Sequence, residues 1–147
     1  MTGITGPALA ALVPHAGAMC LLGSVLSWDA AVILCSATSH LAVDNPLRRA
    51  GRLAAVCGAE YAMQAAALHG ALLDGSACQP AGRVAALRGV RLLVPYLDDP
   101  AFGALRISAQ LQHREAGGLL YGFTLTAADG RPLVSGRAAV ALPRMDI

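Results

Sequence analysis

Apolar residues occupy nearly every position of one stretch of the chain, from Ala50 to Leu73, AGRLAAVCGAEYAMQAAALHGALL. Its residues are mostly good helix formers, which predicts a helix of about 36 Å at ~1.5 Å per residue. A helix that is apolar on all sides must be enclosed by protein or by lipid. Because Arg52 and Glu60 fall within the length of a span and would be costly in lipid, we expect a buried helix and no membrane span.

Shorter segments on both sides of this stretch have the pattern of β-strands. Two of them, 19–28 and 32–40, are separated by a short turn, which predicts an antiparallel pair. Between 104 and 114 apolar and polar residues alternate, which is typical of a half-buried antiparallel strand. Further strands are predicted at 84–94, 119–127 and 132–142.

The predicted order is two strands, one long helix and four strands, with a short helix at 7–12 before them. A long apolar helix among antiparallel strands is buried if the sheet curls around it, which gives an α+β fold of the hotdog type. The 147 residues fit a single domain, 1–147.

The predicted helix carries two polar side chains that are candidates for chemistry, Glu60 and Gln64. Residues four apart share a helix face, so both side chains project into the same surroundings. A carboxylate enclosed by apolar residues tends to have a raised pKa, so we expect Glu60 to have one. A structural carboxylate paired with an arginine remains the alternative interpretation.

Composition narrows the partners and the compartment. The formal net charge is only +2, so we expect no nucleic-acid partner. The four cysteines form no C-x-x-C pair and lie in or near apolar runs, which is typical of reduced thiols in a cytoplasmic protein without a metal site. Only 14% of the residues are charged, against roughly 25% in typical soluble domains, so we expect much surface to be covered in an oligomer.

Two motifs resemble those of hotdog-fold β-hydroxyacyl-(acyl carrier protein) dehydratases, especially the divergent branch associated with aryl-polyene clusters. The segment 13–22, VPHAGAMCLL, is similar to the opening Leu-Pro-His loop and first strand of that family. The segment 58–65, GAEYAMQA, is similar to its helix signature of Glu followed by Gln. The Gly-His-Phe-Pro loop that supplies the catalytic histidine in fatty-acid dehydratases is absent, and Gly23 stands where the opening strand commonly has Asp.

The resemblance implies that the chain removes water from 3-hydroxyacyl thioesters carried on the phosphopantetheine of an acyl carrier protein or on coenzyme A, with no other cofactor. Glu60 would then handle the leaving hydroxyl, and a histidine would take the α-proton. Gln64 could orient Glu60, and a backbone N–H near Gly51 or Gly58 could polarise the thioester carbonyl.

The histidines are not equivalent candidates for this base. His40 precedes the helix much as the family's catalytic histidine does, whereas His15 matches the opening-loop histidine, and we favour His40. His69 is half a helical turn out of phase with Glu60, and we interpret it as a packing residue. His113 continues the apolar face of its strand, which predicts a core histidine.

Three arginines cluster before the helix, Arg48, Arg49 and Arg52. They are either an ordinary solvated loop or a local patch that contacts an acidic carrier protein or the phosphate of its arm.

Two other functions fit the same residues. A hotdog thioesterase also uses a helix carboxylate, and a non-catalytic acyl-binding hotdog subunit would explain the missing loop. For the assembly we expect edge-to-edge pairing of sheets in a homodimer or a multiple of it, or in a heterodimer with a related hotdog subunit.

Overall fold

The computed structural model describes residues 4–5, 20–74 and 83–141. Its strands are β1 (Ile4–Thr5), β2 (Ser24–Trp28), β3 (Val32–Ala37), β4 (Arg83–Leu92), β5 (Leu105–Glu115), β6 (Gly118–Thr126) and β7 (Pro132–Ala141). Its helices are α2 (Gly58–Asp74) and three short 3-10 turns, η2 (Ser39–Leu41), η3 (Ala55–Cys57) and η4 (Pro100–Phe102). The helix predicted at 7–12 lies outside the described residues.

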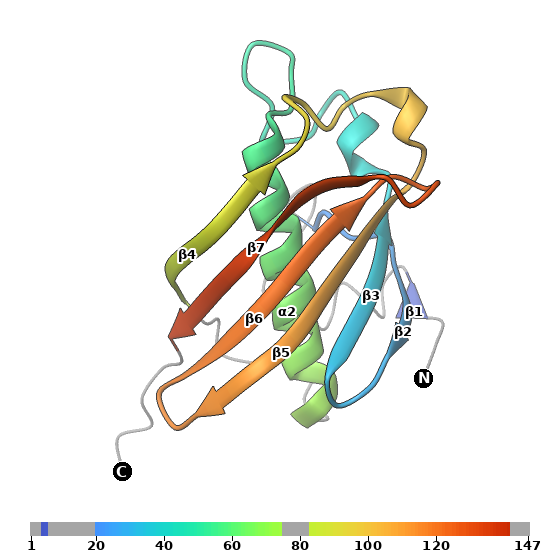
Figure 1. Ribbon diagram of the computed structural model, residues 1–147. Coiled ribbons are helices and arrows are strands. Elements are labelled where there is room, and N and C mark those ends of the chain that lie inside the picture. Colours follow the sequence, from blue (N-terminus) through green and yellow to red (C-terminus); the bar gives the residue numbers. More distant parts are fainter. Residues whose placement is uncertain (1–3, 6–19, 75–82, 142–147) are drawn as a thin grey trace.

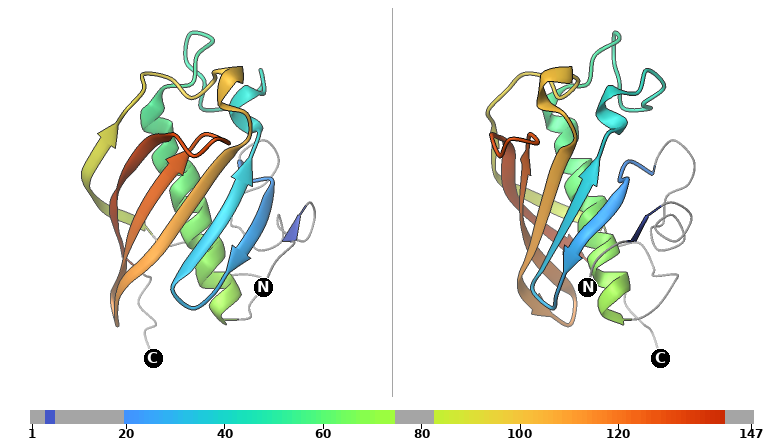
Figure 2. Two further views of the ribbon diagram at one scale, coloured as in Figure 1. Left: turned by 45° about the vertical axis from the view of Figure 1, so that its right-hand side comes forward. Right: turned by 90° about the vertical axis from the view of Figure 1, so that its right-hand side faces the viewer.

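The strands form one antiparallel sheet in the order β1-β2-β3-β5-β6-β7-β4, with α2 lying across one face (Figure 1). The sheet bends around the helix, and the three 3-10 turns gather at the end where α2 begins (Figure 2). The predicted order of two strands, one helix and four strands is confirmed, and β1 adds a short strand beside β2. This is the hotdog arrangement. Among the described residues no helix is long and apolar enough to cross a membrane.

The start of the long helix was predicted wrongly. Residues 50–57 do not belong to it, because Ala50 and Gly51 both have a positive φ and the backbone of Arg49 pairs with that of Arg52 in a tight turn. The following backbone binds a distant segment instead, since the Ala55 amide donates to the Pro95 carbonyl. Arg52 and Gly51 therefore lie in a loop, not on the helix.

The helix begins with a glycine because it touches the sheet there. Gly58 is buried, and a Cβ on it would lie 3.1 Å from Leu125 Cδ2 on β6 and 3.2 Å from Val134 Cγ2 on β7. Both are tighter than ordinary van der Waals contact. A residue without a side chain therefore sets how closely the first turn of α2 approaches the middle of the sheet.

His69 has the packing role that the sequence predicts. Its ring is fully buried, with Nδ1 2.7 Å from Tyr121 Oη on β6 and Nε2 2.7 Å from the Asp29 carbonyl oxygen between β2 and β3. A carbonyl can only accept, so Nε2 carries the proton and Nδ1 accepts from the tyrosine hydroxyl. Burial raises the pKa of Tyr121 to about 12, which keeps that hydroxyl protonated.

We expect Tyr121→Phe to lower the free energy of unfolding by about 1–3 kcal/mol, because the buried Nδ1 of His69 then has no donor. Urea unfolding followed by circular dichroism measures this. Tyr96→Phe is the matched control, since Tyr96 is exposed and its ring contact with Arg52 needs no hydroxyl. Equal stability of Tyr121→Phe and the control would show that the pair contributes nothing.

Candidate functional site

Glu60 and Gln64 lie on the same face of α2, in its first two turns, but their surroundings differ. Gln64 is fully buried, and its Oε1 accepts a hydrogen bond of 2.9 Å from the Leu21 amide, just before β2. Glu60 is only partly buried, in contrast to the fully enclosed carboxylate expected. Gln64 thus faces the segment that precedes β2. His15, the other candidate for the base, lies outside the described residues.

His40 lies in η2, and its ring is fully buried. Neither ring nitrogen has a hydrogen-bond partner among the described residues, so no hydrogen bond joins His40 to the Glu60 carboxylate of its own chain. Burial lowers the pKa of His40 below its usual value. The Gly103 backbone and the charge of Asp98 act to raise the pKa, but burial has the larger effect. The Gly103 backbone also falls outside hydrogen-bond geometry with the ring. The imidazole is therefore neutral at pH 7.

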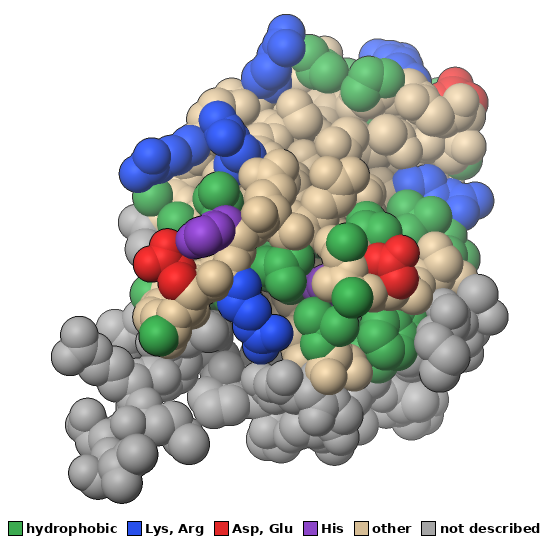
Figure 3. Space-filling model, turned by 60° about the horizontal axis from the view of Figure 1, so that its bottom comes forward, with side chains coloured by type: hydrophobic (Ala, Val, Ile, Leu, Met, Phe, Trp, Pro, Cys, Tyr) green, Lys and Arg blue, Asp and Glu red, His purple; other side chains and the backbone are tan. Residues whose placement is uncertain are grey.

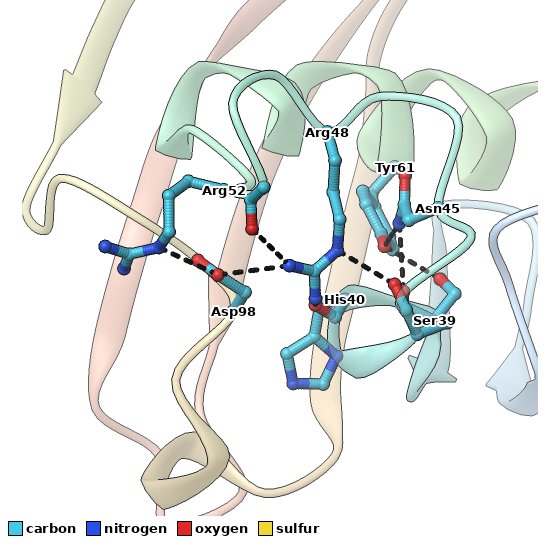
Figure 4. A network of polar contacts seen from close by, with 9 residues as sticks. Ser39, His40, Asn45, Arg48, Arg52, Tyr61 and Asp98 are labelled. Atoms are coloured by element: carbon cyan, nitrogen blue, oxygen red, sulfur yellow. Dashed lines mark hydrogen bonds and ion pairs between the residues drawn. The ribbon is translucent and has the colours of Figure 1, made fainter.

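The η2 turn is joined to the helix by Ser39, Asn45 and Tyr61, none of which the sequence singled out as functional. Ser39 Oγ lies 2.7 Å from Tyr61 Oη, and Asn45 Nδ2 donates to the same hydroxyl at 3.1 Å (Figure 4). The signal available in the sequence was an aromatic hydroxyl on an apolar helix, which needs a partner when buried.

Arg48 is a brace within the loop and not part of a solvated patch. Its guanidinium donates to the carbonyls of Ala42 at 2.8 Å, Gly51 at 2.7 Å and His40 at 3.2 Å, and Nη1 is 3.4 Å from Asp98 Oδ2 (Figure 4). With only 16% of the side chain exposed, Arg48 has little surface left for a partner. It holds η2 in the position that presents the ring of His40.

Arg52 completes this brace from the loop surface. Its Nε is 2.9 Å from Asp98 Oδ2, and its guanidinium lies 3.8 Å above the ring of Tyr96. Burial acts to raise the pKa of Asp98, but the hydrogen bond and charge of Arg52, together with hydrogen bonds from the backbone of Asp98 and Leu53, outweigh it, and the pKa lies below the usual value. The carboxylate is thus ionised at pH 7, with Oδ1 buried and without a hydrogen-bond partner among the described residues.

Of the three clustered arginines, Arg49 is the most available to a partner. It is exposed, and its Nη1 donates to carbonyls of its own loop, Pro46 at 3.1 Å and Arg48 at 2.8 Å. A broad basic patch at this end of the fold is therefore reduced to Arg49 and the half-exposed Arg52.

The two candidate glycines, Gly51 and Gly58, differ in how much room each leaves for a ligand. The Gly58 N–H is already bonded to the carbonyls of Ala55 and Val56, so it cannot also polarise a substrate carbonyl. Gly51 is exposed, has a φ of 76°, and would meet nothing within 4 Å if it carried a Cβ. Of the pair, Gly51 is the one whose surroundings leave room for a ligand.

His113 was predicted wrongly as a core residue. A bulge between Leu111 and His113 shifts the register of β5 against β6, and the His113 side chain is 61% exposed.

In the described part of the chain no group of three or more His, Cys, Asp or Glu side chains could hold a metal ion.

Comparison with solved structures agrees with this fold. The dehydratase heterocomplex ApeI:P from Xenorhabdus doucetiae matches with a TM-score of 0.80 and 22% identity, over 92% of this chain and 91% of that one. The PaaI protein of E. coli from the phenylacetic acid degradation operon matches with a TM-score of 0.58 and 14% identity, over 80% of each chain. A hypothetical thioesterase with coenzyme A from Streptococcus pneumoniae matches with a TM-score of 0.57 and 14% identity, over 84% of this chain and 87% of that one.

These structural matches confirm the hotdog fold. Because their sequence identities are low, they support the fold alone and not a function. No curated protein matches the sequence. A family does match, and it covers nearly the whole chain: the ApeP-like pattern, described as ApeP dehydratase, fits residues 7–147. The chain therefore belongs to the ApeP-like dehydratase family.

Proposed function

We propose that the chain removes water from 3-hydroxyacyl thioesters carried on an acyl carrier protein, with Glu60 and His40 as the proton-transfer groups. The observation that supports this most directly is His40, a buried imidazole that burial keeps neutral and whose two nitrogens have no partner among the described residues. A buried polar group without a partner is rare in folded proteins and calls for an explanation. A general base must be unprotonated and free to accept a proton, and His40 is both.

In the proposed reaction the neutral ring of His40 takes the α-proton of the thioester. The electron pair moves through the enolate to form the Cα–Cβ double bond, and the β-hydroxyl leaves as water with a proton from Glu60. Arg48 acts indirectly, because its bonds to the loop carbonyls hold the turn that carries His40. The overall change is the loss of one water molecule, and no cofactor beyond the phosphopantetheine arm is needed.

The proposed site is shared between two hotdog subunits. Within one chain the described hydrogen bonds join η2 to α2 through Ser39 and Tyr61, and the ring of His40 makes no hydrogen bond to Glu60. Pairing of two sheets at their edges would let the histidine of one chain serve the carboxylate of another. The partner is a second copy or a related hotdog subunit, and the ApeI:P relative is itself described as a heterocomplex.

We expect Glu60→Gln to abolish the loss of water from a 3-hydroxyacyl carrier substrate, because the amide keeps the shape of the side chain without its transferable proton. Mass spectrometry of the carrier measures the change. A thioesterase would instead remove the whole acyl group, so the same spectra separate the two reactions. Asp44→Asn, which also replaces a carboxylate by its amide but at an exposed loop residue, serves as the control. Dehydration by Glu60→Gln at the wild-type rate would remove Glu60 from the mechanism.

We expect His40→Ala to slow dehydration about a hundredfold or more and to be at least as damaging as His15→Ala. Because the pKa of His40 is lowered, the wild-type rate should hold as the pH falls through ~6.5, the ordinary value for histidine. It should be lost only below that, when the ring becomes protonated. Thr38→Ala, an exposed neighbour of the same turn, controls for local disturbance. If only His15→Ala inactivates the protein, the opening loop supplies the base.

Mixing Glu60→Gln with His40→Ala protein tests whether two copies share the site. After random subunit exchange half of the dimers are mixed, and each has one intact site of two, so about a quarter of the wild-type activity should return. Mass measurement of the intact dimers establishes that exchange has occurred. Full exchange without recovered activity would contradict a site shared between copies. Recovery only when a related hotdog subunit is added would identify that subunit as the partner.

A further inference from the structure

Two arginines face each other on the outer side of the sheet, the side away from α2. Arg88 on β4 and Arg137 on β7 are direct cross-strand partners, and both are exposed. Next to Arg137, Ala138 is fully buried, and a Cβ on Gly136 would lie 3.0 Å from the ring of Phe123 in the core. Because alternate residues of a strand face opposite sides, Arg137 and its partner point outward.

This arrangement is unfavourable without a counter-charge. Side chains directly opposite on an antiparallel pair are separated by roughly 5 Å at Cβ, and like charges there are destabilising. In the described part of the chain neither Arg88 nor Arg137 has an ion-pair partner. In Figure 3, where the lower end of the molecule is turned forward, basic side chains are spread around the visible face, and backbone and uncharged polar side chains cover much of its upper middle.

Arg88 and Arg137 both line two adjoining cavities. One, of about 320 Å³, is polar, and it is lined by the hydroxyls of Thr124 and Ser135 and by the side chain of Gln112. Gly122 makes room for that amide, since a Cβ there would lie 2.5 Å from Gln112 Nε2. Its lining contains hydrogen-bond donors and no carboxylate among the described residues, as an oxyanion requires.

The second cavity, of about 550 Å³, extends from the same two arginines toward the β5–β6 turn. Its walls include Leu120 and Ala139, which lie on the same side of the sheet as Arg137 because they alternate with the inward-facing residues of β6 and β7. The one carboxylate in its described lining, Glu115, is 3.1 Å from His113 Nε2 and is thus already paired. A ligand spanning both cavities would place an anionic group at the arginines and an apolar group along these side chains.

We propose that Arg88 and Arg137 form a binding site for an amphipathic oxyanion, a phosphate or carboxylate that carries an alkyl chain. The two guanidinium groups supply forked donors from adjacent strands, and the bound anion replaces their mutual repulsion with two attractive contacts. The site is on the opposite side of the sheet from α2. It is therefore separate from Glu60 and does not depend on the dehydratase proposal.

The test measures binding of octyl phosphate, octanoate, inorganic phosphate and neutral octanol to the full-length protein by calorimetry. We expect octyl phosphate, octanoate or both to bind at least ~10-fold more tightly than inorganic phosphate, with no binding of octanol. The two alkyl anions distinguish a phosphate from a carboxylate head group. Octanol binding as tightly as the anions, or inorganic phosphate binding as tightly as octyl phosphate, would overturn the proposal.

Arg88→Gln and Arg137→Gln should each weaken binding of the alkyl anion at least ~10-fold. Arg106→Gln is the matched control, because Arg106 is exposed on β5 and lines neither cavity, and it should change the affinity less than twofold. Equal weakening by all three would mean diffuse attraction without a site. Without ligand the two test variants should melt no lower than the wild type, since each removes a like-charge contact. A lower melting temperature would show that the arginines are structural and would also overturn the proposal.

Discussion

The fold depends on one constraint, which is that a helix enclosed on nearly all sides must find a partner for each of its buried polar groups. Three such side chains of α2 reach three different elements. Tyr61 contacts Ser39 in η2, Gln64 accepts from the Leu21 amide before β2, and His69 contacts Tyr121 on β6. Because a buried polar group without a partner costs about 1–3 kcal/mol, these contacts fix the rotation of the helix as well as its depth. Apolar packing alone would leave that rotation poorly defined.

Against this background the unsatisfied atoms are informative. Two side chains of the described part have buried polar atoms without partners, His40 at both ring nitrogens and Asp98 at Oδ1. Both belong to the end of the fold where α2 begins, and Arg48 contacts both, at the His40 carbonyl and at Asp98 Oδ2. The protein thus satisfies the polar groups along its helix and leaves exceptions at one end. This concentration is what the proposed binding of a substrate at this end would require.

The sequence predicts the strand order and the buried helix well, because both follow from local periodicity. It fails where distant backbone decides the structure. Residues 50–57 have the composition of the helix that follows, but their backbone groups pair with the segment after β4, as when the Leu97 amide donates to the Leu53 carbonyl. His113 fails for a similar reason, since the alternation of β5 holds through Leu111 and a bulge then changes the side that faces the core.

The candidate site was predictable only in part, because the identity of a residue does not specify its surroundings. Glu60 and Gln64 could be placed on one helix face from their spacing, but nothing local indicates that Gln64 is committed to the Leu21 amide.

The arginines show most clearly that the sequence does not specify the surroundings of a residue. Arg48 and Arg52 look like a solvated patch in the sequence, yet Asp98, about fifty residues away, binds both and turns them into a brace. Arg88 and Arg137 are equally far apart and carry no motif, yet the β4–β7 register places them opposite each other with no carboxylate between them. In the first case a charge pair is completed within the chain, and in the second an identical side chain is left with a like neighbour. The difference lies in which side chain the fold places beside each arginine, and an anion from outside the chain would balance the second pair as Asp98 balances the first.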